Sequence, residues 1–266
     1  MDGLRGVLYL TVVFSTLSVA NAEETAKTAE EILQRYVEDF RQDPAAAEAI
    51  TFGIRITGED GGDWHVTVAG KEQGAEEAKV VLRSGFPTNP APYFKLDLST
   101  LRRIDRGELN AYTAIGASVH GSDAKPMEIG ATPGFEFDAA FLNRFRPFLF
   151  HFWTRGFPER VPFRTELSGS AHGANVVLFY YQEGFRSGWF QMAKGQHINK
   201  DPKDQTNPFP SMFIMIRGKA RAKIGGEEVT FPANETILVP AGVTHEFWNP
   251  YEEPAEMILL MFGEGA

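Results

Sequence analysis

A series of short β-rich segments constrains the second half of the chain. Eight of them follow one another closely, with Gly, Pro and polar residues between most neighbours: 176–181, 185–193, 211–217, 219–224, 227–231, 235–240, 244–249 and 256–262. Gly225-Gly226 is typical of a two-residue hairpin, and Pro240-Ala241-Gly242 of a tight turn. Because such short strands must pair to bury an apolar face, the pattern predicts an all-β sandwich or barrel over residues 171–266.

The segment MIRGKARAKIGGEEVTFPANETILVPAGVTHEFWNP resembles the cupin family, and the resemblance spans about residues 172–264. The second cupin motif, G-x(5)-P-x-G-x(2)-H-x(3)-N, is met by Pro240, Gly242, His245 and Asn249, and Asn234 stands where the first Gly belongs. The resemblance implies a barrel of the double-stranded β-helix type. In metal-binding members the His of this motif is a ligand, so the resemblance makes His245 the candidate metal ligand.

The first cupin motif, G-x(5)-H-x-H-x(3,4)-E-x(6)-G, is not met. Counted back from Gly218, the Glu position holds Ser211. The two His positions hold Gln205 and Asn207, or Asp204 and Thr206 in the longer spacing. A divalent ion needs about three or four His or carboxylate donors once thiolates are excluded, and this chain has no Cys. The sequence therefore predicts no cofactor, with a divalent metal at His245 as the alternative.

The loop 195–210 decides between these two interpretations. If it folds back over the barrel mouth, His197 could join His245, with Asp201 or Asp204 as a further ligand. We therefore predict a cupin pocket that contains His245, Asn249 and His197. Without metal, His245 is expected to hydrogen-bond a ligand or a core partner.

The first half of the chain alternates between helical and β-type patterns. A capping box, Thr28 with Glu31, opens a helix of three to four turns that stops at Asp43-Pro44. Residues 50–56, 64–68 and 78–82 then predict an antiparallel meander. After it we expect a strand, a short helix that stops at Gly107, another strand, and a second helix over residues 137–153.

This order, with the run KLDLSTLRRIDRGELNAYTAIGASVHGSD, resembles the sterol carrier protein 2 (SCP2) family over about residues 28–155. The matching positions are Asp97, Leu98, Leu101, Gly107, Leu109, Ala114 and Gly116. The resemblance implies an α+β fold, a twisted sheet covered by helices around a hydrophobic tunnel for fatty-acyl or sterol-like ligands. It implies no catalytic residues.

The aromatic content of this half also allows an apolar pocket, because the chain has 22 Phe and many of them lie between residues 135 and 163. The residues that we expect to line it recur on neighbouring turns of the second helix: Phe141, Phe145, Phe148, Leu149 and Phe152. Ordinary core packing is the alternative.

The N-terminus is typical of an export signal. Residues 1–22 combine Arg5, an apolar run too short for a comfortable membrane span, and the small-x-small site Ala20-Asn21-Ala22. Cleavage there would leave no integral membrane segment. The mature protein would then lie in the periplasm or outside the cell. We expect an SCP2-like domain over residues 23–155, a Gly- and Pro-containing linker over 156–170, and the barrel over 171–266.

A formal net charge of −9 argues against nucleic acid as a partner, because phosphate binding depends on clustered cations. The sequence thus predicts an exported two-domain protein, more consistent with binding than with catalysis. Its SCP2-like module would hold a lipid or other apolar small molecule, and its degenerate cupin would bind a ligand or form a homodimer. The alternative is a metal-dependent cupin enzyme, of the isomerase or oxygenase type, that uses His245 and His197.

Overall fold

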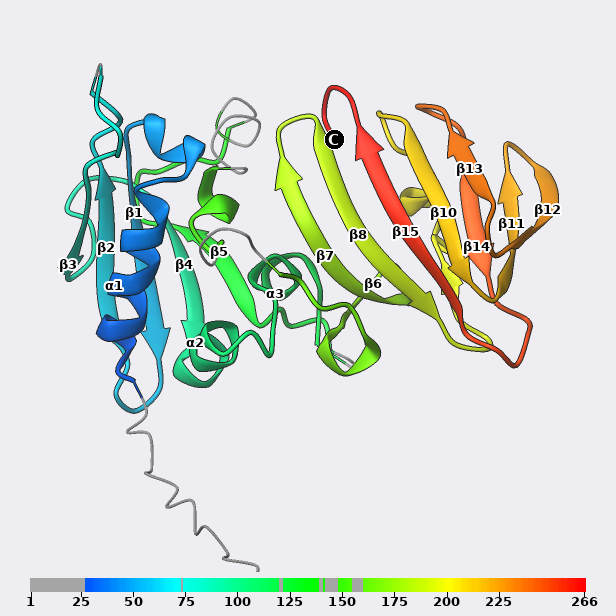
Figure 1. Ribbon diagram of the computed structural model, residues 1–266, viewed down its shortest axis with the longest axis horizontal. Helices are drawn as coiled ribbons and strands as arrows, with labels where there is room; N and C mark the ends of the chain where they lie inside the picture. The colour runs from blue at the N-terminus through cyan, green and yellow to red at the C-terminus, as the bar shows by residue number, and fades with distance from the viewer. Residues whose placement is uncertain (1–26, 73, 120–121, 139–140, 142–147, 155–159) are drawn as a thin grey trace, which may run out of the picture.

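The computed structural model describes residues 27–266 except 73, 120–121, 139–140, 142–147 and 155–159. Two β-sheet units lie side by side along the long axis of the molecule (Figure 1). The predicted signal segment 1–22 lies outside the described residues, as does part of the predicted linker. No helix of the described part is long and apolar enough to span a membrane.

The N-terminal unit is built on a five-stranded sheet in the order β3-β2-β1-β4-β5. Its strands are β1 (Ile50–Thr57), β2 (Gly62–Val68), β3 (Val80–Ser84), β4 (Pro92–Asp97) and β5 (Met127–Ala131). The first three form the predicted antiparallel meander, and β4 pairs with β1 in parallel. The chain therefore returns across the sheet before it reaches β5, a strand that the sequence pattern did not indicate.

Three helices accompany this sheet: α1 (Ala29–Phe40), α2 (Leu98–Asp105) and α3 (Ala111–Gly116). The capping box of α1 is confirmed, because Glu31 N–H donates to Thr28 Oγ1 and Thr28 N–H donates to the Glu31 carboxylate. The helix buries one apolar face, which includes Ile32, Leu33 and Tyr36. The 3-10 helices are η1 (Pro44–Ala47), η2 (Thr165–Leu167) and η3 (Pro202–Asp204). The described residues 141 and 148–151 are also helical.

The strand expected after Gly107 is instead α3. The Asn110 side chain accepts a hydrogen bond from Thr113 N–H and so caps the first turn. Residues 111–115 are all buried, between the sheet of this unit and the neighbouring barrel. A segment that is buried on both sides shows no alternation of polar and apolar residues, so its sequence does not distinguish a short helix from a strand. The prediction of a strand here was wrong for this reason.

The C-terminal unit consists of two sheets, in the orders β13-β10-β15-β8-β7-β6 and β12-β11-β14-β9. The strands are β6 (Gly169–Ala171), β7 (Ala174–Gln182), β8 (Phe185–Met192), β9 (His197–Ile198), β10 (Ser211–Arg217), β11 (Lys219–Ile224), β12 (Glu227–Pro232), β13 (Thr236–Val239), β14 (His245–Trp248) and β15 (Ala255–Phe262). Each of the eight predicted segments overlaps one of these strands. The all-β prediction is confirmed.

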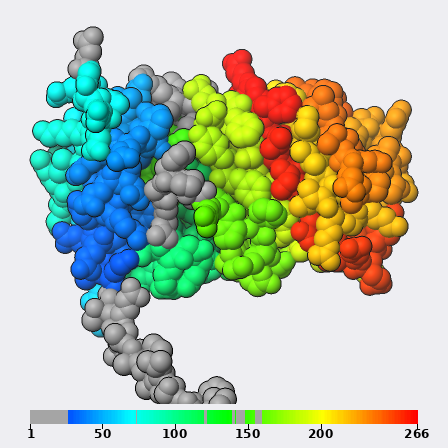
Figure 2. Space-filling view, viewed as in Figure 1, coloured from blue at the N-terminus to red at the C-terminus, as the bar shows by residue number. Residues whose placement is uncertain are grey.

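The two units share an interface centred on α3 and β7. Thr113 Oγ1 accepts a hydrogen bond from Leu178 N–H at 2.9 Å. Ser118 and Ser170 exchange two backbone hydrogen bonds of 2.8 and 2.7 Å. Ala117, directly after α3, belongs to the apolar core of the barrel. In the space-filling view the two units form one continuous surface (Figure 2).

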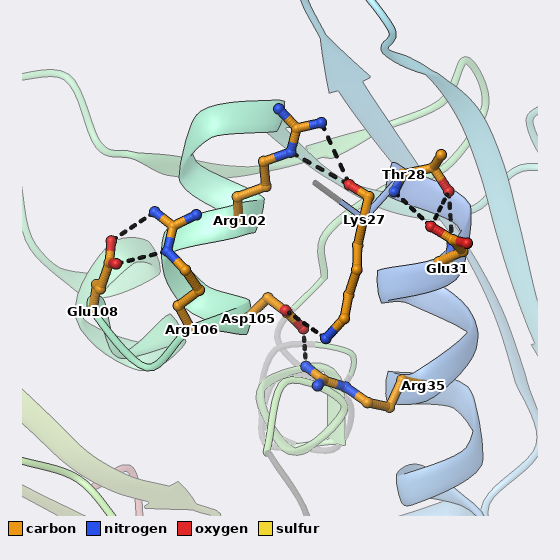
Figure 3. A network of polar contacts seen from close by, with 8 residues as sticks. All are labelled: Lys27, Thr28, Glu31, Arg35, Arg102, Asp105, Arg106 and Glu108. Atoms are coloured by element: carbon orange, nitrogen blue, oxygen red, sulfur yellow. Dashed lines mark hydrogen bonds and ion pairs between the residues drawn. The ribbon is translucent and has the colours of Figure 1, made fainter. Parts of the chain in front are cut away.

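A buried carboxylate ties the helices of the N-terminal unit together (Figure 3). The Asp105 side chain at the end of α2 is 8% exposed and forms ion pairs with Lys27 and with Arg35 of α1. Next to it, Arg106 and Glu108 form an ion pair in which both side chains are about half exposed. Removing the buried Asp105 carboxylate should cost more stability than removing that of Glu108, because solvent screens the charges of an exposed pair but compensates those around a buried group poorly.

We expect Asp105→Asn to lower the free energy of unfolding by about 2 kcal/mol, because the variant leaves two cations near a buried site without a counter-charge. Thermal denaturation should show a drop in Tm of about 4–8 °C. Glu108→Gln is the matched control and should leave the Tm unchanged. Equal effects of the two substitutions would contradict the assignment of α1–α2 stability to Asp105.

Candidate functional site

A cavity of about 600 Å³ lies between the two units. On the N-terminal side its walls come from α3 and β5, with Ile115 and Met127 among the lining residues, and from Phe150. On the barrel side they come mainly from β7, β8, β10 and β15, with Leu178 and Leu259 among them. The volume lies within the range of small-molecule sites, and most of the lining side chains are apolar.

An irregularity in β7 shapes one end of this cavity. The pairing of β7 with β8 shifts between Leu178 and Tyr180. An extra residue in one strand changes which side chains face each side of the sheet. Leu178 before this shift and Tyr180 and Tyr181 after it all line the cavity.

His245 lines the barrel side of the cavity. It is the first residue of β14 and is 2% exposed, and its backbone N–H donates to Gln205 O at 2.8 Å. Its Nδ1 lies 3.1 Å from Val243 O. Because a carbonyl oxygen can only accept, we assign the ring proton to Nδ1. Burial lowers the pKa of His245 below its ordinary value, so the ring is neutral at pH 7 and Nε2 carries a lone pair.

Two further buried polar side chains line the cavity, Ser187 of β8 and Asn199 after β9, which are 7% and 8% exposed. Within the described part of the chain, neither side chain makes a hydrogen bond, and His245 Nε2 makes none either. These atoms are accessible from the cavity, since none of them belongs to the polar atoms that are fully buried and lack a hydrogen-bond partner. Such groups need a partner from water or from a ligand.

The loop 195–210 does fold along the barrel mouth. Gln205 O accepts from His245 N–H, and Asn207 O accepts from Gly242 N–H at 2.8 Å. Asp204 lines the cavity and lies 3.6 Å from the exposed His172, whereas the Asp201 side chain accepts from Lys203 N–H. The loop therefore supplies part of the cavity wall.

The loop does not bring His197 to His245, which corrects the expected pairing. His197 lies opposite Trp248 in the β9–β14 pair, and its Nε2 is 2.8 Å from Glu246 Oε2. Successive residues of a strand point to opposite faces, so Glu246 and its partner His197 lie on the face away from the His245 ring. The two imidazoles are separated by the sheet itself.

Asn249 has a structural role that the predicted pocket did not anticipate. It is 1% exposed, and its Nδ2 donates to Met192 O and Glu253 O, both at 2.9 Å. Its Oδ1 accepts from Tyr251 N–H. These bonds occupy both amide hydrogens and the amide oxygen, so Asn249 holds the turn after β14 and is not among the residues that line the cavity.

The aromatic segment contributes to the site through a residue that we did not predict. Phe148, Leu149 and Phe152 are 0–4% exposed, and Phe152 makes edge contacts with Phe40 and Phe52 in the core. Phe141 contacts Phe135 and Phe137, and Phe145 lies outside the described residues. None of the four described residues is among those that line the cavity, and Phe150 takes that place. For this helix, ordinary core packing is the better interpretation.

The groups around His245 do not suit a divalent metal. Of the positions where metal-binding cupins carry ligands, Asn207 and, in the longer spacing, Asp204 line the cavity, but the exposed Asp204 carboxylate lies 3.6 Å from His172. The Glu position holds the buried Ser211, whose Oγ lies 3.4 Å from Asn207 Nδ2. Among the described residues there is no group of three His, Cys, Asp or Glu side chains that could hold an ion. One imidazole and neutral oxygen donors make a weak site.

Comparison with known families supports the barrel. The family model described as "Cupin domain" matches residues 188–261. Residues 188–261 are a cupin domain. The cupin thus holds His245 on one of its two sheets, and the six-stranded sheet continues into β7 and β6, outside the matched range. No curated protein matches the sequence.

Several solved structures are similar to 34–40% of this chain. A cupin 2 conserved barrel domain protein from Salinispora arenicola is 17% identical, covers 40% of this chain and 88% of its own, and gives a TM-score of 0.35. The Cnp3 cupin domain of Schizosaccharomyces pombe is 16% identical, with coverages of 40% and 77% and a TM-score of 0.34. A predicted oxalate decarboxylase from Thermotoga maritima is 12% identical, with coverages of 34% and 79% and a TM-score of 0.31.

Sequence reasoning missed Ser187, Asn199 and Phe150. The sequence gives no clear signal for Ser187, because it follows Arg186 in a strand that also contains Gln191. Asn199 has a φ of 57°, a left-handed conformation that Asn tolerates better than most residues, but the sequence does not show where its side chain lies.

We expect a chelator to leave the melting curve of the wild-type protein unchanged to within about 1 °C, because the donors around His245 cannot hold a stabilising ion. Differential scanning fluorimetry with and without EDTA, and after addition of Zn²⁺ or Mn²⁺, measures this. A drop of several degrees with EDTA that is absent in His245→Ala would show that a metal binds at His245.

The lowered pKa of His245 predicts a specific pH dependence of stability. Above about pH 6.5 the ring is neutral in both the folded and unfolded chains. Below that pH, and down to the lowered folded-state pKa, the unfolded chain binds more protons, so stability falls as the pH falls. Urea unfolding at pH 7.5 and 5.5 should show a smaller loss for His245→Gln than for the wild type. His172→Gln, at an exposed site, should behave like the wild type.

Proposed function

We propose that this protein binds a mostly apolar small molecule in the cavity between its cupin domain and its N-terminal unit. One observation carries the proposal: the cavity is bounded by apolar side chains from both units, yet buried polar groups without a protein partner face into it. Leaving such groups unsatisfied is unfavourable, so a site of this kind is stable with water or a ligand present.

The resemblance of residues 28–155 to the SCP2 family supports an apolar ligand. That family's expected fold, a sheet covered by helices, agrees with the architecture of the N-terminal unit. In our proposal the ligand contacts α3 and β5 of this unit rather than the interior of the aromatic core. The binding site is then shared, and neither unit would complete it alone.

We further propose that the protein is exported and acts as a carrier or receptor for its ligand outside the cytoplasm, since residues 1–22 have the pattern of a cleaved signal. Intact-mass measurement of the protein from its native host would reveal cleavage after Ala22. Homodimerisation through the cupin domain remains a prediction. A metal-dependent enzyme is less well supported, because His197 and His245 lie on opposite faces of their sheet.

Filling the cavity tests the binding function. Ile115 of α3 is 5% exposed and lines the cavity, so Ile115→Trp should place the larger ring in the space that the ligand needs. We expect the affinity for Nile red, a neutral apolar dye, to fall at least about tenfold, as measured by fluorescence titration. Leu238→Trp is the control, because Leu238 is 55% exposed on β13 and does not line the cavity. Equal dye binding by all three proteins would contradict the proposed site.

A further inference from the structure

The buried polar groups of the cavity indicate the chemistry of the ligand, provided that the proposed binding function is correct. We propose that the ligand is an apolar alcohol, with an aliphatic or ring-shaped body, whose hydroxyl group donates a hydrogen bond to His245 Nε2. Ser187 and Asn199 are the other buried polar side chains that line this space without a protein partner.

The direction of the hydrogen bond follows from the tautomer of His245. Its Nδ1 lies 3.1 Å from Val243 O, an acceptor, and therefore carries the proton of the neutral ring. Burial favours that neutral ring. Nε2 is left with a lone pair that faces the cavity, so a ligand group that meets it must be a donor.

The distribution of charge excludes an anionic group at this position. The charged side chains of Lys125, Glu128 and Asp204, which line the cavity, are exposed at its rim. Arg186 is half-buried, with its guanidinium over the rings of Tyr181 and Phe209 and a hydrogen bond from Nη2 to Gly265 O. A carboxylate beside His245 would meet the lone pair of Nε2 and otherwise neutral groups. Nothing there would compensate the free energy that the carboxylate loses when it leaves water.

A cationic group is disfavoured for the same reason, since the buried lining groups include no carboxylate. A hydroxyl group satisfies the site in both directions. Its hydrogen goes to His245 Nε2, and its oxygen stays free to accept from water or from a donor on the cavity wall, where Ser187 and Asn199 are the buried neutral donors. The apolar body of the molecule would lie against the walls around Ile115, Leu178 and Leu259.

Three compounds with the same chain test this inference by displacement of Nile red at pH 7.5: 1-decanol, its methyl ether 1-methoxydecane, and decanoate. The ether keeps the oxygen but lacks the donor, and decanoate replaces the donor by a charge. We expect 1-decanol to displace the dye at concentrations at least about tenfold lower than either of the others, because a donor-lacking analogue leaves buried polar groups unpaired.

Two variants test whether His245 causes the preference for the alcohol. In His245→Phe the acceptor is gone, so the alcohol and the ether should displace the dye within about twofold of each other. In His245→Gln the side-chain oxygen can still accept, and the alcohol should remain preferred. If His245→Phe fails to fold, the wild-type ranking and His245→Gln still decide the question.

The outcomes separate the two proposals. Displacement by 1-methoxydecane or decanoate as effective as by 1-decanol would overturn the alcohol inference and leave the apolar binding site intact. An unchanged alcohol preference in folded His245→Phe would equally overturn the role of Nε2. Failure of the wild-type protein to bind Nile red or any of the three compounds would overturn the proposed function, and this inference with it.

Discussion

The packing of α3 against β7 joins the two units and creates the space between them. A Cβ atom on Gly116 would lie 2.3 Å from Leu178 Cδ1, so a larger residue at this position would force the Leu178 side chain to move. The N–H of Leu178 is satisfied from the other unit, by Thr113 Oγ1. A buried backbone donor requires such a partner, so the helix and the strand depend on each other. The cavity walls, and the burial of the groups that face the cavity, follow from this contact.

The donor groups in the interior of this cupin domain differ from those of a metal-binding site. Where the first motif would supply charged or imidazole donors, this chain places Asn207 and Ser211, and His245 remains. A lone buried imidazole is stable when neutral, and Val243 O fixes its tautomer. The arrangement is suited to hydrogen bonding with an uncharged molecule, since the buried polar groups that line the cavity are themselves uncharged.

The N-terminal unit shows how the same residues can support two interpretations. Its concentration of Phe suggested a lined pocket, but Phe148 and Phe152 pack edge-to-face into the core with Phe40. Periodicity places residues on a helix face but does not say whether that face meets other side chains or an open space. Among the described residues of this aromatic segment, Phe150 lines the cavity.

The sequence by itself determined the elements that local chemistry specifies. The capping box of α1, the meander β1–β3 and the strands of the barrel could be predicted, because capping residues, alternation and turn residues act over a few positions. The second cupin motif also located His245 correctly. Of the candidate site, this one residue was placed where the structure has it.

The tertiary structure alone decided what surrounds His245. Strand pairing put His197 on the opposite face, and the turn after β14 used all the hydrogen-bonding capacity of Asn249. Ser187 and the residues of α3 meet across the two units although more than 70 positions separate them from one another in the sequence. Local pattern carries no information about such contacts, because they depend on how complete elements pack and on which surfaces are left to face each other.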